Sequence, residues 1–410
     1  MILPAFRCRS CGSDRSTLVL DLGSQPLANR LPAPSDLDQP EPRFPLRLLV
    51  CQSCWLCQIS DVIPPETLFS DYLYFTSNSD TMMRHARDAA VRYTREFSLG
   101  PSSRVIEIAS NDGYLLTHFL QVGVPCLGIE PAANIAAAAR TRGIPTLAEF
   151  FDSRLARRLA ADGQRADLVL GNNVFAHVPD INDFVAGLAA VLQPRGRAIL
   201  EFPYAVDLLE RNEFDTIYHE HVFYFSLTAL EPVFARHGLA IVRIERIPIH
   251  GGSLRLFASP AGGHAADETV AALRAIEHAK GVDRLGFYAG FGRQVEAIRQ
   301  SLRDLLARLR REGRSIAAYG ASAKGSTMLN FFGLGADTIE FIADRSPHKQ
   351  GRLSPGMHIP IVPPDRILER QPDYMLLLTW NFAEEILAQQ SEYRRRGGRF
   401  IIPIPSVQVV

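Results

Sequence analysis

The chain lacks net charge, long apolar runs and basic clusters. Its 44 lysines and arginines balance 44 aspartates and glutamates over 410 residues. The absence of a basic run argues against nucleic acid or an anionic membrane as a partner. No stretch of about 18 apolar residues occurs, so we expect no transmembrane helix. The first residues also lack the pattern of a signal peptide, which leaves a cytoplasmic protein as the expectation.

Cysteine is scarce in most of the chain, because five of the six lie within the first 57 residues. Such clustering does not fit a secreted disulfide framework in a long chain. Cys8 and Cys11 form one C-x2-C pair, and Cys51 and Cys54 form another. Four thiolates in two such pairs predict a structural, tetrahedral zinc site. Cys57 continues the spacing and could replace one ligand, and reduced cysteines without metal are the alternative.

The G-x-G-x-x-G loop of dinucleotide-binding folds is absent. In its place 104–116 reads RVIEIASNDGYLL, a short apolar strand, a turn of small residues and a helix-like pattern. Such a turn presents backbone N–H groups and a helix N-terminus to a ligand. The single glycine, Gly113, argues against a pyrophosphate and suits a ligand with amino-acid and nucleoside ends, such as S-adenosylmethionine. An ordinary strand–turn–helix unit is the alternative.

Strand and helix patterns alternate through residues 101–260, which predicts an α/β fold with a doubly wound, Rossmann-like sheet. Open sheets of this kind bind ligands at the carboxyl ends of their strands. Glu130 ends the second strand and is placed to accept both ribose hydroxyls. The predicted cofactor-binding residues are Glu107, Ala109, Asn111, Asp112, Gly113, Tyr114, Glu130, Asn172 and Asn173.

Amphipathic helical residues 266–312 follow, and residues 313–410 restart an α/β pattern with a second parallel sheet. We therefore expect three domains, at 1–65, 66–262 and 263–410.

Residues 213–226, EFDTIYHEHVFYFS, hold the densest group of ionisable side chains. Tyr218, His219, Glu220 and His221 stand in a row, and two or three of them could converge on one site. Histidine is the usual general base near neutral pH, and a nearby carboxylate can orient it. The spacing does not fit a zinc protease helix. Polar surface residues beside an apolar core are the alternative.

Three further stretches could contact a substrate. Residues 71–80 combine aromatic rings with hydroxyls, as a lid or as loop packing. HGGSLR offers backbone N–H groups and a guanidinium to an anion or sugar hydroxyls, or forms a plain hairpin. GASAKGST is a phosphate-friendly turn at a helix N-terminus, but not a P-loop. The predicted substrate-binding residues are Tyr74, Ser77, Tyr204, Tyr224, His250, Gly252, Ser253, Arg255, Tyr319, Ser322, Lys324 and Arg345.

Taken in order, the four-cysteine module, EIASNDG, NNVFAHVPD, FDTIYHEHVFYFS, HGGSLR and YGASAKG resemble the sugar C-methyltransferases, which act on nucleotide-linked 4-keto-6-deoxyhexoses. The resemblance covers nearly the whole chain. It implies a small zinc-binding domain, a class I methyltransferase domain and a C-terminal α/β domain that helps to hold the nucleotide-sugar. It also implies S-adenosyl-L-methionine as cofactor and a structural zinc.

The resemblance assigns roles as well. His221 matches the base that removes the sugar α-proton, Tyr218 and Glu220 match residues that line that site, and His177 matches a residue that faces the ketone. Tyr72 or Tyr74 matches an aromatic that closes over the substrate. The predicted catalytic residues are therefore His221, Glu220, Tyr218, His177 and Tyr72. At Ala109 and Ser110 the chain departs from the family pattern of glycine and cysteine.

The expected reaction is methylation at C3 of a dTDP- or GDP-linked sugar by a monomer or weak dimer. A methyltransferase that acts on RNA, or on an oxygen or nitrogen of another small molecule, is one alternative, although the neutral charge balance disfavours RNA. The others are an inactive nucleotide-sugar binding protein and an epimerase that uses the same enolate.

Overall fold

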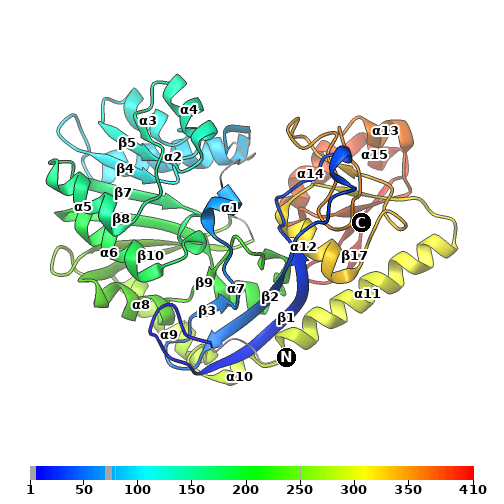
Figure 1. Ribbon diagram of the computed structural model, residues 1–410, viewed down its shortest axis with the longest axis horizontal. Helices are drawn as coiled ribbons and strands as arrows, with labels where there is room; N and C mark the ends of the chain where they lie inside the picture. The colour runs from blue at the N-terminus through cyan, green and yellow to red at the C-terminus, as the bar shows by residue number, and fades with distance from the viewer. Residues whose placement is uncertain (1–5, 70–75, 79, 250) are drawn as a thin grey trace.

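The computed structural model describes residues 6–69, 76–78, 80–249 and 251–410 (Figure 1). Of the predicted site residues, Tyr72, Tyr74 and His250 lie outside the described part. Three sheets with four, seven and six strands organise the described residues. Within this part of the chain, no helix has both the length and the apolar character that crossing a bilayer requires.

The N-terminal sheet has the antiparallel order β1-β2-β3-β9. Its strands are β1 (Ser16–Pro26), β2 (Arg43–Cys51), β3 (Cys57–Ile59) and β9 (Phe223–Tyr224). Strand β9 comes from the middle of the chain and directly follows the Tyr-His-Glu-His stretch. It pairs with β3, with Cys57 opposite Tyr224. The N-terminal module is therefore hydrogen-bonded to the stretch that carries the predicted base.

The central sheet has the order β10-β11-β8-β7-β4-β5-β6. Strands β4 (Val105–Ile108), β5 (Cys126–Ile129), β6 (Thr146–Leu147), β7 (Ala166–Asn172) and β8 (Leu192–Pro203) are parallel. Strand β11 (Ser253–Pro260) runs antiparallel between β8 and β10 (Leu239–Ile247). Numbered along the chain, this order is 3-2-1-4-5-7-6, which confirms the predicted doubly wound sheet.

Alternating residues of the parallel strands enter two separate cores, because a strand points successive side chains to opposite faces. Val105 and Leu168 pack with α2 (Asp80–Glu96) and α3 (Leu116–Gln121). Ile106 and Val169 pack on the other face, with α5 (Ser153–Ala161), α6 (Ile181–Val191) and α8 (Leu227–Arg236). Both faces are buried, which explains the near-continuous apolar runs of these strands.

The C-terminal sheet has the order β14-β13-β12-β15-β16-β17, and only β17 is antiparallel. Its strands are β12 (Ile316–Tyr319), β13 (Ile342–Ala343), β14 (Ile361–Val362), β15 (Tyr374–Leu377), β16 (Arg399–Ile402) and β17 (Gln408–Val409). Numbered along the chain this order is 3-2-1-4-5-6, a second doubly wound arrangement. Helices α12 (Ala323–Phe332), α13 (Arg366–Arg370), α14 (Ala383–Gln389) and α15 (Ser391–Arg395) accompany it.

Helices α9 (Glu268–Lys280), α10 (Leu285–Tyr288) and α11 (Phe291–Arg311) connect the two larger sheets. The yellow helix α11 runs beside the blue strand β1 in Figure 1, and the two elements are in contact. The remaining elements are α1 (Pro65–Phe69), α4 (Ala133–Thr141) and α7 (Ala205–Glu210), with the short 3-10 turns η1 (Pro34–Asp36), η2 (Thr76–Asn78), η3 (Phe175–His177), η4 (Phe214–Thr216) and η5 (Trp380–Phe382).

Candidate functional site

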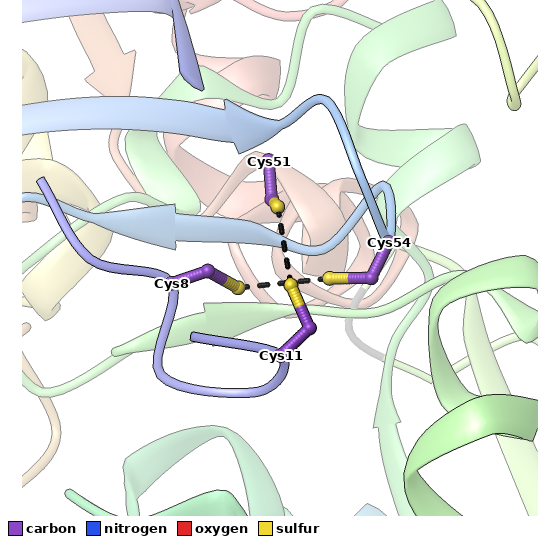
Figure 2. Close-up of side chains that lie close together, drawn as sticks. All are labelled: Cys8, Cys11, Cys51 and Cys54. Carbon is purple, nitrogen blue, oxygen red and sulfur yellow. Dashed lines mark hydrogen bonds between the residues drawn. The ribbon is translucent and has the colours of Figure 1, made fainter. Parts of the chain in front are cut away.

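The four predicted metal ligands point toward one another (Figure 2). The sulfurs of Cys8, Cys11, Cys51 and Cys54 all lie within 4.8 Å of each other. The Sγ–Sγ distance is 3.6 Å for Cys8 and Cys54 and also for Cys11 and Cys51. Tetrahedral zinc with bonds of about 2.3 Å places its sulfurs about 3.8 Å apart, so this donor set fits the ion. The buried Cys57 lies outside the group, which leaves the four ligands of the two C-x2-C pairs.

The turn after β4 has a backbone that favours small residues. Ala109, Asn111 and Gly113 all have positive φ, at 54°, 49° and 78°. A Cβ at Gly113 would stand 2.6 Å from a side-chain carbon of Ile144, so this position requires glycine. The Ser110 side chain is buried against β5 rather than on the open side of the turn.

Ala109, where the resemblance predicts glycine, has a left-handed backbone that favours glycine. In this left-handed conformation an alanine lowers the free energy of unfolding by roughly 1–2 kcal/mol. Glycine avoids this strain, but it loses part of the gain because its backbone gives up more entropy on folding. We expect Ala109→Gly to raise the free energy of unfolding by about 1 kcal/mol, measured by urea denaturation. The control is Ala137→Gly, at an exposed position inside α4, which should lower it by about 1 kcal/mol. Equal effects of the two variants would contradict this explanation.

Glu130 lies beside this turn, at the end of β5. Its Oε2 accepts the N–H of Asn111 at 3.0 Å and its Oε1 accepts the N–H of Ala132 at 2.9 Å. Burial raises the pKa of Glu130, and these backbone donors oppose the rise. Each carboxylate oxygen keeps a further lone pair for a ribose hydroxyl.

Two buried carboxyl oxygens around the same turn have no hydrogen-bond partner among the described residues. They are Oε2 of Glu107 and Oδ1 of Asp112. Burial raises the pKa of Glu107 well above its ordinary value, and the charge of Glu130 adds to this rise. Buried polar atoms without partners are rare in folded proteins. Their gathering at this turn fits a polar ligand with amine and hydroxyl donors, as S-adenosylmethionine has.

The turn η2 packs on the turn after β4, from Ala109 to Gly113. The N–H of Thr76 donates to Oδ1 of Asn111 at 2.9 Å, and the hydroxyl of Ser77 donates to the Asp112 carboxylate. Arg142 donates to the same carboxylate at 2.9 Å. Ser77, predicted as a substrate contact, is therefore hydrogen-bonded to the turn from Ala109 to Gly113.

The asparagines predicted for the cofactor lie at the carboxyl end of β7. Asn172 ends the strand, and Asn173 has a φ of 54° and donates its N–H to the carbonyl of Glu201 at 2.8 Å. The chain continues directly into η3, which carries His177. One short stretch thus links the carboxyl end of β7 to the predicted catalytic residue His177.

Three predicted catalytic side chains lie close together, two of them after η4 (Tyr218 and His221) and one on η3 (His177). His221 Nδ1 lies 2.8 Å from the carbonyl of Thr216, so it carries the proton and donates. Its Nε2 is then an acceptor, 2.9 Å from the Tyr218 hydroxyl. The rings of His177 and His221 are 4.8 Å apart, and the buried Tyr224 ring lies 6.3 Å from His221. Burial lowers the pKa of His177 to about 4, which keeps this imidazole neutral near pH 7.

Glu220 is buried beside this group and turns toward the N-terminal module. The side-chain amide of Asn29 donates to both of its carboxylate oxygens, at 2.7 and 2.9 Å. Burial raises the pKa of Glu220 to about 7, and Asn29 and the positive charge of Lys349 oppose the rise. The Asn29 amide and the charge of Lys349 therefore favour the ionised form of this buried carboxyl.

Two acids of the same stretch face the C-terminal sheet. Trp380 donates its indole N–H to Asp215 at 2.7 Å, and the Lys324 ammonium lies 4.8 Å above the indole ring. Burial raises the pKa of Glu213 to about 7 and that of Asp215 to about 6, and the charge of Lys324 opposes both shifts.

The raised pKa of Glu213 makes stability depend on pH. Between about pH 4.5 and 7 the folded chain binds more protons at this carboxyl than the unfolded chain does, so the free energy of unfolding falls as pH rises. Glu213→Gln should remove up to about 3 kcal/mol of that fall, measured by urea denaturation from pH 4.5 to 8. The control is Glu210→Gln, an exposed partner of Lys280. Parallel curves for the parent and Glu213→Gln would contradict the prediction.

The predicted substrate role of Arg255 needs correction. Its Nε donates to Glu201 at 2.7 Å and its Nη1 to Glu245 at 3.1 Å, and its side chain is buried. His85 from α2 also binds Glu201, at 2.8 Å. Two carboxylates already neutralise this guanidinium, so it ties α2, β8 and β11 together instead of facing an anion.

Three neighbouring residues that were predicted to bind substrate also have structural partners or a packing role. The buried Tyr204 donates its hydroxyl to Glu277 at 2.9 Å, and the hydroxyl of Ser253 donates to a backbone carbonyl at 3.0 Å. Gly252 has a φ of 134°, and a Cβ there would stand 2.5 Å from Asp207 Oδ2. The glycine is needed for close packing of the hairpin on α7, and the two hydroxyls have structural partners.

The predicted phosphate-friendly turn lies between β12 and α12. Ser322 caps the helix, because its Oγ accepts an N–H of the first turn at 3.0 Å. Lys324 stands on this first turn, over the ring of Trp380, and the exposed Arg345 follows β13 at the same edge of the sheet. Tyr319 ends β12 and is buried, which raises the pKa of its hydroxyl.

Sequence reasoning missed Asn29, Asp215 and Trp380 as partners of the site. The contact of Asn29 with Glu220 joins residues 191 positions apart, and that of Trp380 with Asp215 joins residues 165 apart. Periodicity and spacing report on neighbours within one element, so neither contact leaves a local signal. An asparagine three residues after a strand, in QPLANR, is the hint that the sequence contains.

Comparison with known proteins finds three families along the chain. The zinc binding domain family matches residues 8–69, the methyltransferase domain family matches 82–244, and the C-methyltransferase C-terminal domain family matches 248–405. The central sheet is therefore the class I methyltransferase fold, and the chain is a methyltransferase with S-adenosyl-L-methionine as its cofactor and a zinc-binding N-terminal module.

More particularly, the chain belongs to the C-methyltransferase family that includes NovU of Streptomyces niveus. It is 38% identical to that protein over 411 residues, which cover 100% of this chain and 98% of NovU. A ubiquinone biosynthesis O-methyltransferase of Rhodopseudomonas palustris is 32% identical over 130 residues, which cover 28% of this chain and 47% of that protein.

Two solved structures are similar to the central part. The PH0226 protein of Pyrococcus horikoshii OT3 has a TM-score of 0.38 at 15% identity and covers 49% of this chain and 100% of its own. Magnesium protoporphyrin IX methyltransferase (ChlM) of Synechocystis PCC 6803 has a TM-score of 0.35 at 16% identity, covering 46% and 86%.

Proposed function

We propose that this C-methyltransferase acts in deoxysugar biosynthesis on a nucleoside-diphosphate-linked 4-keto-6-deoxyhexose and methylates its C3 carbon. The observation that carries the proposal is the hydrogen bonding of His221. Because Nδ1–H is held by the Thr216 carbonyl, Nε2 is a proton acceptor with a fixed direction. A carbon nucleophile requires such a base, because an unactivated C–H has no lone pair to offer.

The neighbouring side chains suit the charge that forms next. A ketone beside C3 makes the C3 proton acidic, and its removal by His221 gives an enolate. His177 is neutral near pH 7, so it can donate one N–H to the enolate oxygen. The Tyr218 hydroxyl, which donates to His221 Nε2 in this structure, must turn to the enolate oxygen before Nε2 can accept the C3 proton. Donors already aimed at the developing charge lower the barrier without reorganisation.

The residues proposed for the cofactor lie at the carboxyl ends of β4, β5 and β7, and η3 after β7 carries His177, whose ring lies 4.8 Å from that of the proposed base. We propose that Glu130 and the turn from Ala109 to Gly113 hold the nucleoside and amino-acid ends of S-adenosyl-L-methionine, with Asn172 and Asn173 alongside. When bound, this cofactor supplies an electrophilic methyl group. Holding both reactants in one site lowers the activation free energy by several kcal/mol relative to their encounter in solution.

The C-terminal sheet is proposed to hold the nucleotide, as the domain spanning 263–410. Lys324, the N-terminus of α12 and Arg345 suit the diphosphate of a dTDP- or GDP-linked sugar. In this scheme 1–65 form the zinc-binding domain and 66–262 the methyltransferase domain.

The test is incubation of the purified chain with S-adenosyl-L-methionine and a panel of 4-keto nucleotide-sugars. A mass gain of one methyl, with the new carbon located at C3 by NMR, supports the proposal. Methylation of oxygen or nitrogen would contradict it, and so would deuterium exchange without methyl transfer, which would indicate an epimerase.

A further inference from the structure

A side chain of the N-terminal module reaches the catalytic stretch. Asn29 lies just after β1, and its Nδ2 donates to Oε1 of Glu220 at 2.7 Å and to Oε2 at 2.9 Å. Glu220 is 3% exposed, and a buried carboxylate needs donors to remain charged. An ionised carboxylate has about four acceptor sites, so one face of Glu220 remains available for a further donor.

The backbone around Asn29 is held on both sides. Strand β1, which precedes it, belongs to the same sheet as β9, which follows Glu220. On the other side, the carbonyl of Leu31 accepts from Arg352 at 3.0 Å, and that of Pro32 accepts the N–H of Leu353 at 2.9 Å. The blue segment after β1 accordingly runs beside the orange and red part of the chain in Figure 1.

Asparagine suits this place better than the residues nearest to it in shape. Its amide donates to both oxygens and adds no charge, whereas an aspartate would put a second carboxylate against Glu220. From the C-terminal part, the positive charge of Lys349 favours the ionised form of Glu220. The N-terminal module therefore contacts this carboxylate directly, and the C-terminal part acts on it through charge.

We propose that Asn29 is a positioning residue for the methyl transfer: it fixes the orientation and charge of Glu220 so that the free face of this carboxylate accepts a hydroxyl of the sugar. The proposal rests on the proposed function, because it assigns Glu220 a substrate contact. It also gives the N-terminal module a part in the reaction beyond holding a metal.

The test compares Asn29→Ala, Glu220→Gln and the double variant, with Arg30→Ala as the control at the exposed next residue. Asn29→Ala should lower kcat on the order of tenfold, with the Kd for S-adenosylmethionine unchanged, and Asn29→Asp should lower it further. In the Glu220→Gln background, Asn29→Ala should lower kcat little further, because Asn29 acts through Glu220. A normal kcat for Asn29→Ala, or losses that multiply fully in the double variant, would overturn the proposal.

A second readout does not depend on turnover. The difference in unfolding free energy between the parent and Glu220→Gln, followed across pH, reports the titration of Glu220. Tyr218, His219, His221 and Lys349 are present in both proteins, so their titrations largely cancel. Asn29→Ala should move the midpoint to higher pH, and an unmoved midpoint would overturn the proposal. If the parent methylates no keto-sugar, the proposed function fails, while this measurement still decides whether Asn29 sets the charge of Glu220.

Discussion

Replacement of His221 by alanine should lower turnover of a 4-keto nucleotide-sugar by roughly 100- to 10,000-fold, the range for loss of a general base. Its imidazole is the group whose orientation is most fully determined, by the Thr216 carbonyl at Nδ1 and the Tyr218 hydroxyl at Nε2. The cofactor turn lies on other elements, so the Kd for S-adenosylmethionine should not change. Single-turnover assays and calorimetry measure the two quantities.

The matched control is His219→Gln, two positions away. His219 is also buried, but its Nε2 donates to the carbonyl of Pro45 at 3.2 Å, which glutamine can imitate. This variant should keep turnover within a few-fold of the parent. If His221→Ala turns over at the normal rate, another residue is the base. If His219→Gln loses turnover with an unchanged melting temperature, the catalytic role within residues 218–221 was assigned to the wrong histidine.

The fold followed from sequence pattern wherever burial imposes a period. Val105–Ile108 and the strands on either side are short apolar runs between helices, and the structure confirms them as β4, β5 and β7. The glycine-rich turn GASAKG was also sufficient to place a strand before it and a helix after it. Pattern alone could not show that β9 leaves the central part and joins the N-terminal sheet, since a two-residue strand has no period.

The candidate site was predictable in kind and only partly in arrangement. Cysteine spacing is a direct consequence of ligand geometry, so Cys8, Cys11, Cys51 and Cys54 were recognisable before their sulfurs were seen together. The role of Arg255 could not be predicted in this way. An arginine beside glycines suits an anion equally well whether the anion is a substrate or an internal glutamate. The structure supplies Glu201 and Glu245, which lie 54 and 10 positions away.

Loss of one metal ligand should have the second large effect. Cys51→Ser should reduce the zinc content from one ion per chain to near zero, measured by plasma mass spectrometry. Structural zinc contributes on the order of 10 kcal/mol to folding in small zinc-binding peptides, more than a small module can replace by packing. Cys51 ends β2, the strand that pairs with β3, so the sheet that includes β9 should lose its order too.

Cys57→Ser separates the metal from the cysteine itself. Cys57 is buried in β3 and lies outside the group of four sulfurs, so this variant should retain one zinc per chain. It should also keep most of its turnover, whereas Cys51→Ser should lose turnover together with zinc because Glu220 then lacks its partner from the N-terminal module. If Cys57→Ser loses zinc while Cys51→Ser retains it, the metal ligand is Cys57 and not Cys51. Full turnover in zinc-free Cys51→Ser would instead show that methyl transfer does not depend on the N-terminal sheet. The proposed connection from β1 through Asn29 to Glu220 would then be wrong as well.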